Sequence, residues 1–179
     1  MTSQPATRKL FFALWPDEGT RRRLYDATRA FSGDGLVMPA ANLHLTLVFV
    51  GHVDAATQRC METAAAQLRQ APFELVLDCI DSFGRKILWA GSRQPPDALF
   101  ELQRSLDGVL AEGCGHRPEQ RPYRPHVTLQ RKLRRPVRDR LPEAVIWRVD
   151  RFSLIESVAT NRPATPPRYH PLRHWPLRA

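Results

Sequence analysis

Residues 42–51 read NLHLTLVFVG, and residues 124–131 read RPHVTLQR. Both stretches contain the tetrad His-x-Thr-Leu inside an apolar run. The composition predicts roughly 0.04 copies of this tetrad by chance, so two copies indicate a shared task. Side chains alternate along a strand, which places the histidine and threonine of each tetrad on one face and the apolar residues on the other. The repeat therefore predicts two strands that each present an imidazole beside a hydroxyl.

The segments around the tetrads predict a mixture of strands and helices. Apolar runs indicate strands at residues 10–15, 43–51, 73–80, 87–91 and 126–131, one or two more within 145–158 with a bend near Asp150, and an edge strand at 169–177. Helical spacing indicates helices over 17–31, over 55–69, and from Asp97 to a stop at Gly113. No low-complexity linker divides the chain, so we expect a single domain over 1–179 with one tetrad in each of two lobes.

Charge and composition narrow the class of protein. The 179 residues carry 27 Lys plus Arg against 18 Asp plus Glu, a net charge of +9 that favours an anionic partner such as RNA or a nucleotide. The longest early apolar run is far shorter than a membrane span, so we expect a cytoplasmic protein. The odd number of cysteines and their wide spacing suggest neither a disulfide framework nor a metal site, and we expect Cys60, Cys79 and Cys114 to be buried small side chains.

Two histidines and two threonines that converge on one cleft would suit a phosphate. A neutral imidazole can take a proton from water, while a protonated one can give a proton to a departing alkoxide. Threonine hydroxyls can bond the non-bridging oxygens, so neither a metal nor a cofactor is required. Arg131 follows the second tetrad and is a candidate phosphate contact, although strand alternation places it opposite His126 unless the strand ends or twists there.

The chain resembles the two-histidine, LigT-type phosphoesterases, specifically the RNA 2′,3′-cyclic phosphodiesterases. The resemblance rests on the two tetrads at 44–47 and 126–129 and extends to lesser stretches along nearly the whole chain. It implies a bilobal α+β fold in which two antiparallel sheets flank a central groove, with helices outside and an approximate two-fold axis. It also implies hydrolysis of a 2′,3′-cyclic phosphate end to a 2′-phosphate, with 2′-5′ RNA ligation as a secondary activity.

The resemblance also implies a role for each site residue. His44 would be the general acid at the 3′-oxygen and His126 the general base that activates water, although these two labels are exchangeable. Thr46 and Thr128 would hold the phosphate. An aromatic residue of the first strand, Phe12, is a candidate for stacking on the terminal base, although a place in the core is the favoured alternative for this side chain. The substrate would be an RNA with a 2′,3′-cyclic phosphate end or a cyclic nucleotide. The protein would act as a monomer and would need neither a cofactor nor a metal.

Two alternatives remain open at this point. One is a non-catalytic RNA-binding module of the same fold, although such a module has little reason to keep two matched proton-transfer groups. The other concerns the basic run RKLRRPVRDR at 131–140, which is either a contact to the RNA backbone or a solvated loop.

Overall fold

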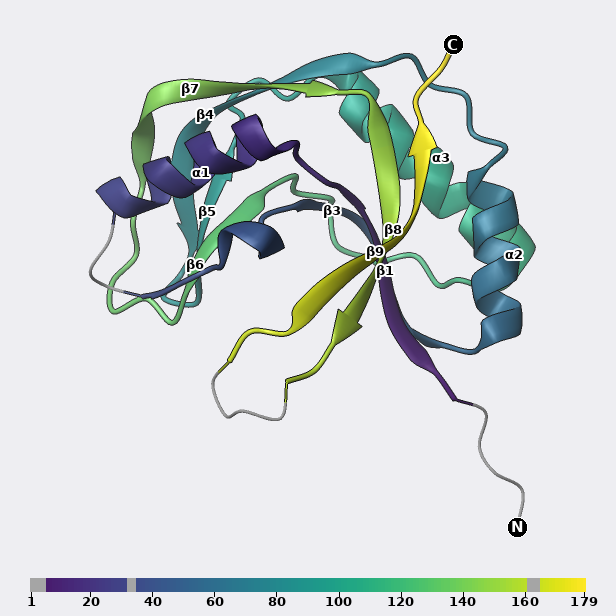
Figure 1. The fold of residues 1–179 in the computed structure, drawn as a ribbon. Coiled ribbons are helices and arrows are strands. Elements are labelled where there is room, and N and C mark those ends of the chain that lie inside the picture. The colour runs from purple at the N-terminus through teal and green to yellow at the C-terminus, as the bar shows by residue number, and fades with distance from the viewer. Residues whose placement is uncertain (1–5, 32–34, 161–164) are drawn as a thin grey trace.

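The computed structural model describes residues 6–31, 35–160 and 165–179 (Figure 1). The strands are β1 Arg8–Leu14, β2 Leu36–Val37, β3 Leu45–Val53, β4 Phe73–Phe83, β5 Ile87–Gly91, β6 Val127–Arg131, β7 Asp139–Val149, β8 Arg151–Val158 and β9 Arg168–Pro176. The helices are α1 Glu18–Ala30, α2 Ala55–Ala65 and α3 Asp97–Cys114, with a short 3₁₀ turn at Ala40–Asn42. The α+β class and most of the expected elements are confirmed, whereas β2 and the 3₁₀ turn were not expected.

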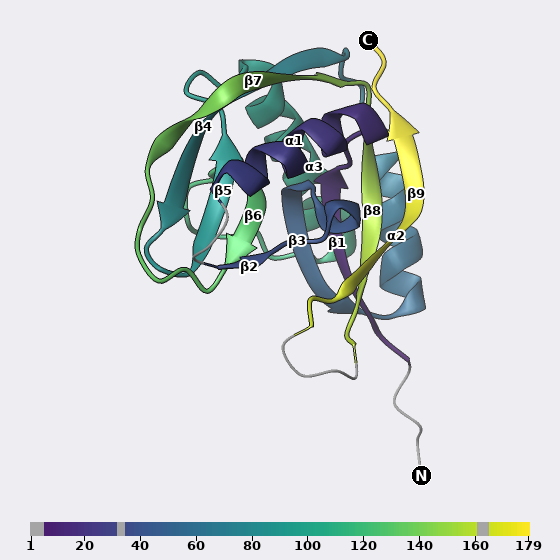
Figure 2. The same ribbon diagram turned by 60° about the vertical axis from the view of Figure 1, so that its left-hand side comes forward.

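In the described part of the chain, nine strands form one antiparallel sheet in the order β7-β4-β5-β6-β3-β1-β8-β9, with β2 paired to β6. The centre of this order is weak, because β3 and β6 are joined by the single residue pair Leu45–Val127. The two sheets expected from the sequence are therefore two halves that meet at one point. β1, β3, β8 and β9 make one half, and the remaining strands make the other (Figure 2).

Helices cover both halves of the sheet. α1 contacts β6 and β7, while α2 packs on α3 and α3 also contacts β3. Figure 1 shows α1 on one side of the molecule and the α2–α3 pair on the other. Cys60 of α2 and Cys114 of α3 form a disulfide, which contradicts the expectation of buried free cysteines. The sequence concealed this bond because the two cysteines become neighbours only when the helices pack.

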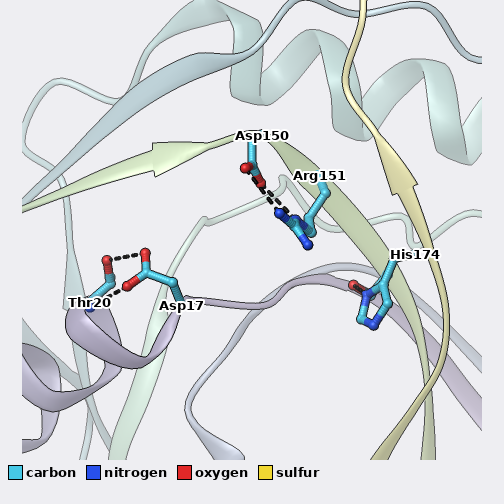
Figure 3. A network of polar contacts seen from close by, with 6 residues as sticks. Asp17, Thr20, Asp150, Arg151 and His174 are labelled. Atoms are coloured by element: carbon cyan, nitrogen blue, oxygen red, sulfur yellow. Dashed lines mark hydrogen bonds and ion pairs between the residues drawn. The ribbon is translucent and has the colours of Figure 1, made fainter.

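Local signals explain where several elements begin and end. The Asp17 carboxylate accepts hydrogen bonds from the Thr20 amide and hydroxyl, both at 2.8 Å, and so caps α1 (Figure 3). α3 continues past the expected stop at Gly113 and ends before Gly115, whose φ of +69° suits a residue without a Cβ. The expected bend lies at Asp150, between β7 and β8, and the expected edge strand is β9.

The core occupies the sheet face opposite the tetrad histidines. Phe12 is fully buried there and packs against Phe152 and Trp175. The structure therefore contradicts the expectation that Phe12 stacks on a base. Its neighbour Phe11 points to the other face and joins a smaller cluster with Ala13. No helix among the described residues has the length and apolar character needed to cross a membrane.

Candidate active site

The pairing of β3 with β6 brings the two tetrads together. Leu45 and Val127 are the paired residues, and each directly follows a tetrad histidine. In an antiparallel pair the flanking residues run in opposite directions, so each histidine comes to lie opposite the threonine of the other tetrad. The apolar tetrad positions are buried, whereas the histidines and threonines are half-buried. One residue pair thus creates a surface with two imidazoles and two hydroxyls.

Both imidazoles are held by the same kind of hydrogen bond to the backbone. Nδ1 of His44 lies 2.6 Å from the Asn42 carbonyl oxygen, and Nδ1 of His126 lies 2.7 Å from the Arg124 carbonyl oxygen. A carbonyl oxygen only accepts, so each Nδ1 must carry the proton that it donates. In the neutral ring Nε2 is then a proton acceptor. Each tetrad therefore supplies a ring of fixed tautomer whose Nε2 can accept a proton.

Three aromatic side chains lie beside the His44 ring. Its ring centre lies 4.9 Å from that of Phe11, 5.8 Å from that of Trp15 and 5.0 Å from that of Tyr169. The Trp15 ring is nearly parallel to the imidazole, with an angle of 14° between the planes. These apolar neighbours remove water from the ring, which disfavours its charged form.

The electrostatics of the site keep both histidines neutral. Burial, and to a smaller extent positive charge on His126 and on Arg131, lowers the pKa of His44 to about 4, although the hydrogen bond to the Asn42 carbonyl opposes this shift. Burial also lowers the pKa of His126, with an additional contribution from Arg131. Because both values lie below the ordinary 6.5, the free protein holds two proton acceptors at neutral pH.

Arg131 lies on the side of the sheet that carries the two tetrad histidines. Its charge lowers the pKa of both, and it contacts the Tyr169 hydroxyl. A β-bulge explains why strand alternation does not apply. Leu88 and Trp89 are consecutive in β5, but their partners in β6 are Gln130 and Thr128, so one residue of β6 is extra. The bulge shifts the alternation by one position and turns the guanidinium toward the site.

Tyr169 is a site residue that sequence reasoning missed. It lies in β9 and packs edge-on against Phe11, with ring centres 5.1 Å apart, as well as against His44. Burial raises the pKa of Tyr169, and the Arg131 guanidinium opposes that rise. The sequence shows only an aromatic residue at the start of an edge strand. Its place beside His44 depends on the adjacency of β9, β8 and β1 in the sheet.

A cavity of ≈ 1420 Å³ adjoins one side of this arrangement. Thr46 and His126 line it, together with residues 114–124 and parts of β3 and α2. His44 and Thr128 do not line it. The two histidines therefore differ in surroundings, because one is closed in by aromatic rings and the other borders open space.

Comparison with known proteins identifies the family. Residues 15–161 match the model of the 2′-5′ RNA ligase superfamily. The chain belongs to the 2′-5′ RNA ligase superfamily. It is 34% identical, over 95% of this chain and 97% of the relative, to an RNA 2′,3′-cyclic phosphodiesterase of Escherichia coli. It is 31% identical, over 76% of this chain and 78% of the relative, to a protein of the same name from Methanothermobacter thermautotrophicus.

Solved structures of this superfamily agree with the fold. The structure of E. coli LigT complexed with 3′-AMP superposes with a TM-score of 0.86 at 31% identity, covering 96% of this chain and 99% of that one. LigT complexed with phosphate gives a TM-score of 0.83 at 29% identity, covering 97% and 99%. The resemblance inferred from the two tetrads is confirmed.

Within the described ranges, no three histidine, cysteine or carboxylate side chains gather in a way that would hold a metal ion. Of the residues expected at the site, the structure brings together His44, Thr46, His126, Thr128 and Arg131. Phe12 is excluded by its burial. The chemical roles of the five remain predictions.

Proposed function

We propose that this protein hydrolyses the 2′,3′-cyclic phosphate at RNA ends to a 2′-phosphomonoester. The names of the relatives support the substrate and the reaction type. One structural observation carries the mechanism, namely the Leu45–Val127 pair that brings two imidazoles of fixed tautomer beside each other. Two proton-transfer groups on one small surface are what the opening of a cyclic phosphodiester needs, because one proton leaves water and another must reach the departing oxygen.

The proposed reaction has one bond-forming and one bond-breaking step at phosphorus. Nε2 of His126 takes a proton from water, and the water oxygen forms a bond to phosphorus. The bond from phosphorus to the 3′-oxygen then breaks, and Nε2 of His44 gives its proton to that oxygen. The product keeps the phosphate on the 2′-oxygen and has a free 3′-hydroxyl. Exchanging the two labels leaves the balance of atoms unchanged.

The low pKa of His44 sets a condition on this mechanism. A ring with a pKa of about 4 is neutral at pH 7 and holds no proton to donate. An anionic phosphate between the rings favours the charged imidazole, so the general acid takes up its proton together with the substrate. The free protein at neutral pH is thus mostly in a state that must gain one proton before it can react.

The remaining site residues stabilise charge on the phosphate. The hydroxyls of Thr46 and Thr128 donate to non-bridging oxygens as negative charge grows on them. Arg131 adds a fixed positive charge on the same side of the sheet and can form a bidentate contact. These groups together with the two imidazoles account for the reaction without a metal. We further propose that the protein works as a monomer in the cytoplasm.

The identity of the bond that breaks tests the function. The protein, treated with a chelator, is incubated with an oligonucleotide that ends in a 2′,3′-cyclic phosphate, and the product is followed by phosphorus NMR. We expect a 2′-phosphate to accumulate. A 3′-phosphate, activity that returns only with a divalent metal, or tight binding without turnover would each contradict the proposal. Addition of a second RNA with a 5′-hydroxyl tests whether the protein also ligates RNA ends through a 2′-5′ bond.

A further inference from the structure

We propose that the cavity beside His126 is a subsite for the nucleotides that precede the cyclic end of an RNA strand. This inference rests on the function proposed above and adds to it a preference for RNA chains over cyclic mononucleotides. The cyclic phosphate must lie between the imidazoles, so the preceding nucleotides have to leave the site along some surface. The cavity begins at Thr46 and His126 and extends away from them.

The size of the cavity exceeds what the reacting group needs. Its ≈ 1420 Å³ lies above the ~300–1,000 Å³ that is typical of small-molecule pockets. The topology explains why this space exists. Among the described residues, Leu45–Val127 is the single pair that joins β3 to β6 in the sheet, and the segment that leads into β6 is tied to β3 by the Tyr123 side chain instead of by further strand pairing.

Segment 115–124, which forms one wall of the cavity, carries an excess of positive charge. Arg117, Arg121 and Arg124 all line the cavity and are exposed. Glu119 pairs with Arg121 at 2.9 Å, but both side chains are largely in solvent. Such an exposed pair is weak, so a phosphate can replace the carboxylate at little cost. The wall can therefore meet more than one phosphate of an RNA backbone.

This wall is anchored rather than loose. The disulfide at Cys114 ties its beginning to α2, and Nε2 of His116 lies 2.9 Å from the Asp107 carboxylate. Near its end, the Tyr123 hydroxyl donates to the Thr46 carbonyl oxygen at 2.9 Å. A wall that is fixed at both ends presents its arginines without a large ordering cost on binding.

An exposed aromatic ring among the lining residues of the cavity suits a nucleobase. Phe49 of β3 lines the cavity and is 58% exposed, which is unusual for so large an apolar side chain. It pairs with Phe11 in the sheet, so both rings lie on the face that carries the active site. The ammonium of Lys9 lies 5.7 Å from the Phe49 ring centre. An aromatic platform beside positive charge is the usual surface for single-stranded nucleic acid.

The basic run at 131–140 is less suited to this task. Residues 132–140, all within the described ranges, do not line the cavity. Within that run Leu133 is buried, and Arg138 pairs with Asp81 at 3.1 Å. Arg134 and Arg140 are exposed and lie outside the cavity, which makes them a matched control for the arginines of the wall.

The experiment compares two substrates that share the same terminal nucleotide. One is the 2′,3′-cyclic mononucleotide, and the other is a tetranucleotide that ends in it. We expect the wild-type protein to have a higher kcat/KM for the tetranucleotide. In Arg117→Gln/Arg121→Gln, kcat/KM for the tetranucleotide should fall by about tenfold at low salt. The slope of log kcat/KM against log salt concentration should become shallower by about 1.4, because two phosphate contacts to a single strand are lost. Phe49→Ala should lower the same value by about tenfold.

The controls separate the two proposals. Hydrolysis of the mononucleotide should be unchanged in these variants, and Arg134→Gln/Arg140→Gln should change neither substrate by more than about twofold. Equal kcat/KM for both substrates in the wild-type protein would overturn the subsite while leaving the proposed function in place. Loss of the chain-length preference in Arg134→Gln/Arg140→Gln but not in Arg117→Gln/Arg121→Gln would also overturn it. Turnover of neither substrate would overturn the proposed function, and the subsite with it.

Discussion

His44, just before β3, and His126, just before β6, share a local design but differ in their surroundings. Both rings donate from Nδ1 to the carbonyl two residues earlier in the chain. His44 is enclosed by aromatic rings from β1, from Trp15 just after β1 and from β9, whereas His126 has Phe83 and Trp89 beside it and borders the cavity. The comparison shows that the local sequence around each tetrad fixes the tautomer and the orientation of its imidazole. Segments far away in the chain decide how readily each imidazole is protonated.

The largest expected effect comes from removal of either ring. His44→Ala and His126→Ala should each lower kcat for cyclic phosphate hydrolysis by about 10³-fold, because each removes one of the two proton transfers. The double variant should lose little more than a single variant, since the pair acts as a unit. His170→Ala is the matched control, because this residue is an exposed histidine of β9. A single variant that kept its rate would show that only one ring transfers a proton.

A substrate with a better leaving group distinguishes acid from base. In a nucleoside 2′-phosphate esterified with 4-nitrophenol, the leaving group is 4-nitrophenolate. This anion is weakly basic, so it can depart without a proton from a general acid. We expect this substrate to restore the rate of His44→Ala far more than that of His126→Ala. The opposite result would exchange the two labels and leave the rest of the mechanism intact.

Arg131 lowers the pKa of both rings, so its removal tests whether they share one electrostatic site. Arg131→Gln should lower kcat by about 10²-fold through loss of a charge on the phosphate. It should also raise the pKa of His44 and of His126, which NMR titration of the ring protons would show. Arg131→Lys keeps the charge and should leave both values low. If the pKa values of both histidines were unchanged in Arg131→Gln, Arg131 would not act on the two rings as proposed.

The difference between the two rings also predicts a pH profile. Catalysis needs one protonated and one neutral ring, so kcat/KM should be largest between the two free-enzyme pKa values, one of about 4 and the other below 6.5. Above the higher value kcat/KM should fall about tenfold per pH unit, because both rings become neutral. Below pH about 4 it should fall again, because both become charged. A kcat/KM that stays flat from pH 5 to 8 would contradict the shared role of the two rings.

The smallest expected effect on activity concerns the covalent anchor that precedes His126. The Cys60–Cys114 disulfide closes a loop with a sequence separation of 54 residues. Cys60→Ser/Cys114→Ser should lower the free energy of unfolding by about 4 kcal/mol. Hydrolysis of the cyclic mononucleotide should hardly change, because neither cysteine touches the proposed reacting groups. Urea denaturation measures the first quantity, and an unchanged midpoint would count against a stabilising bond.

Patterns of neighbouring residues allowed much of the fold to be predicted. The apolar runs gave the strands, and Asp17 and Asp97 marked the starts of helices that the structure confirms. The stop of α3 was misplaced at Gly113, because both Gly113 and Gly115 are compatible with a helix end and only the backbone conformation of Gly115 shows which one is used. Base stacking by Phe12 is ruled out by its burial, and its core alternative is confirmed, because alternation predicts that Phe11 and Phe12 face opposite sides but not which side is the core.

The sequence by itself determined which groups the candidate site offers, because each tetrad places an imidazole and a hydroxyl on one face through the two-residue period of a strand. Only the tertiary structure decided how that chemistry is tuned. The bulge in β6 turned Arg131 toward the histidines, β9 brought Tyr169 to His44, and helix packing joined Cys60 to Cys114. These contacts depend on strand order and packing between segments far apart in the chain, which no local pattern encodes.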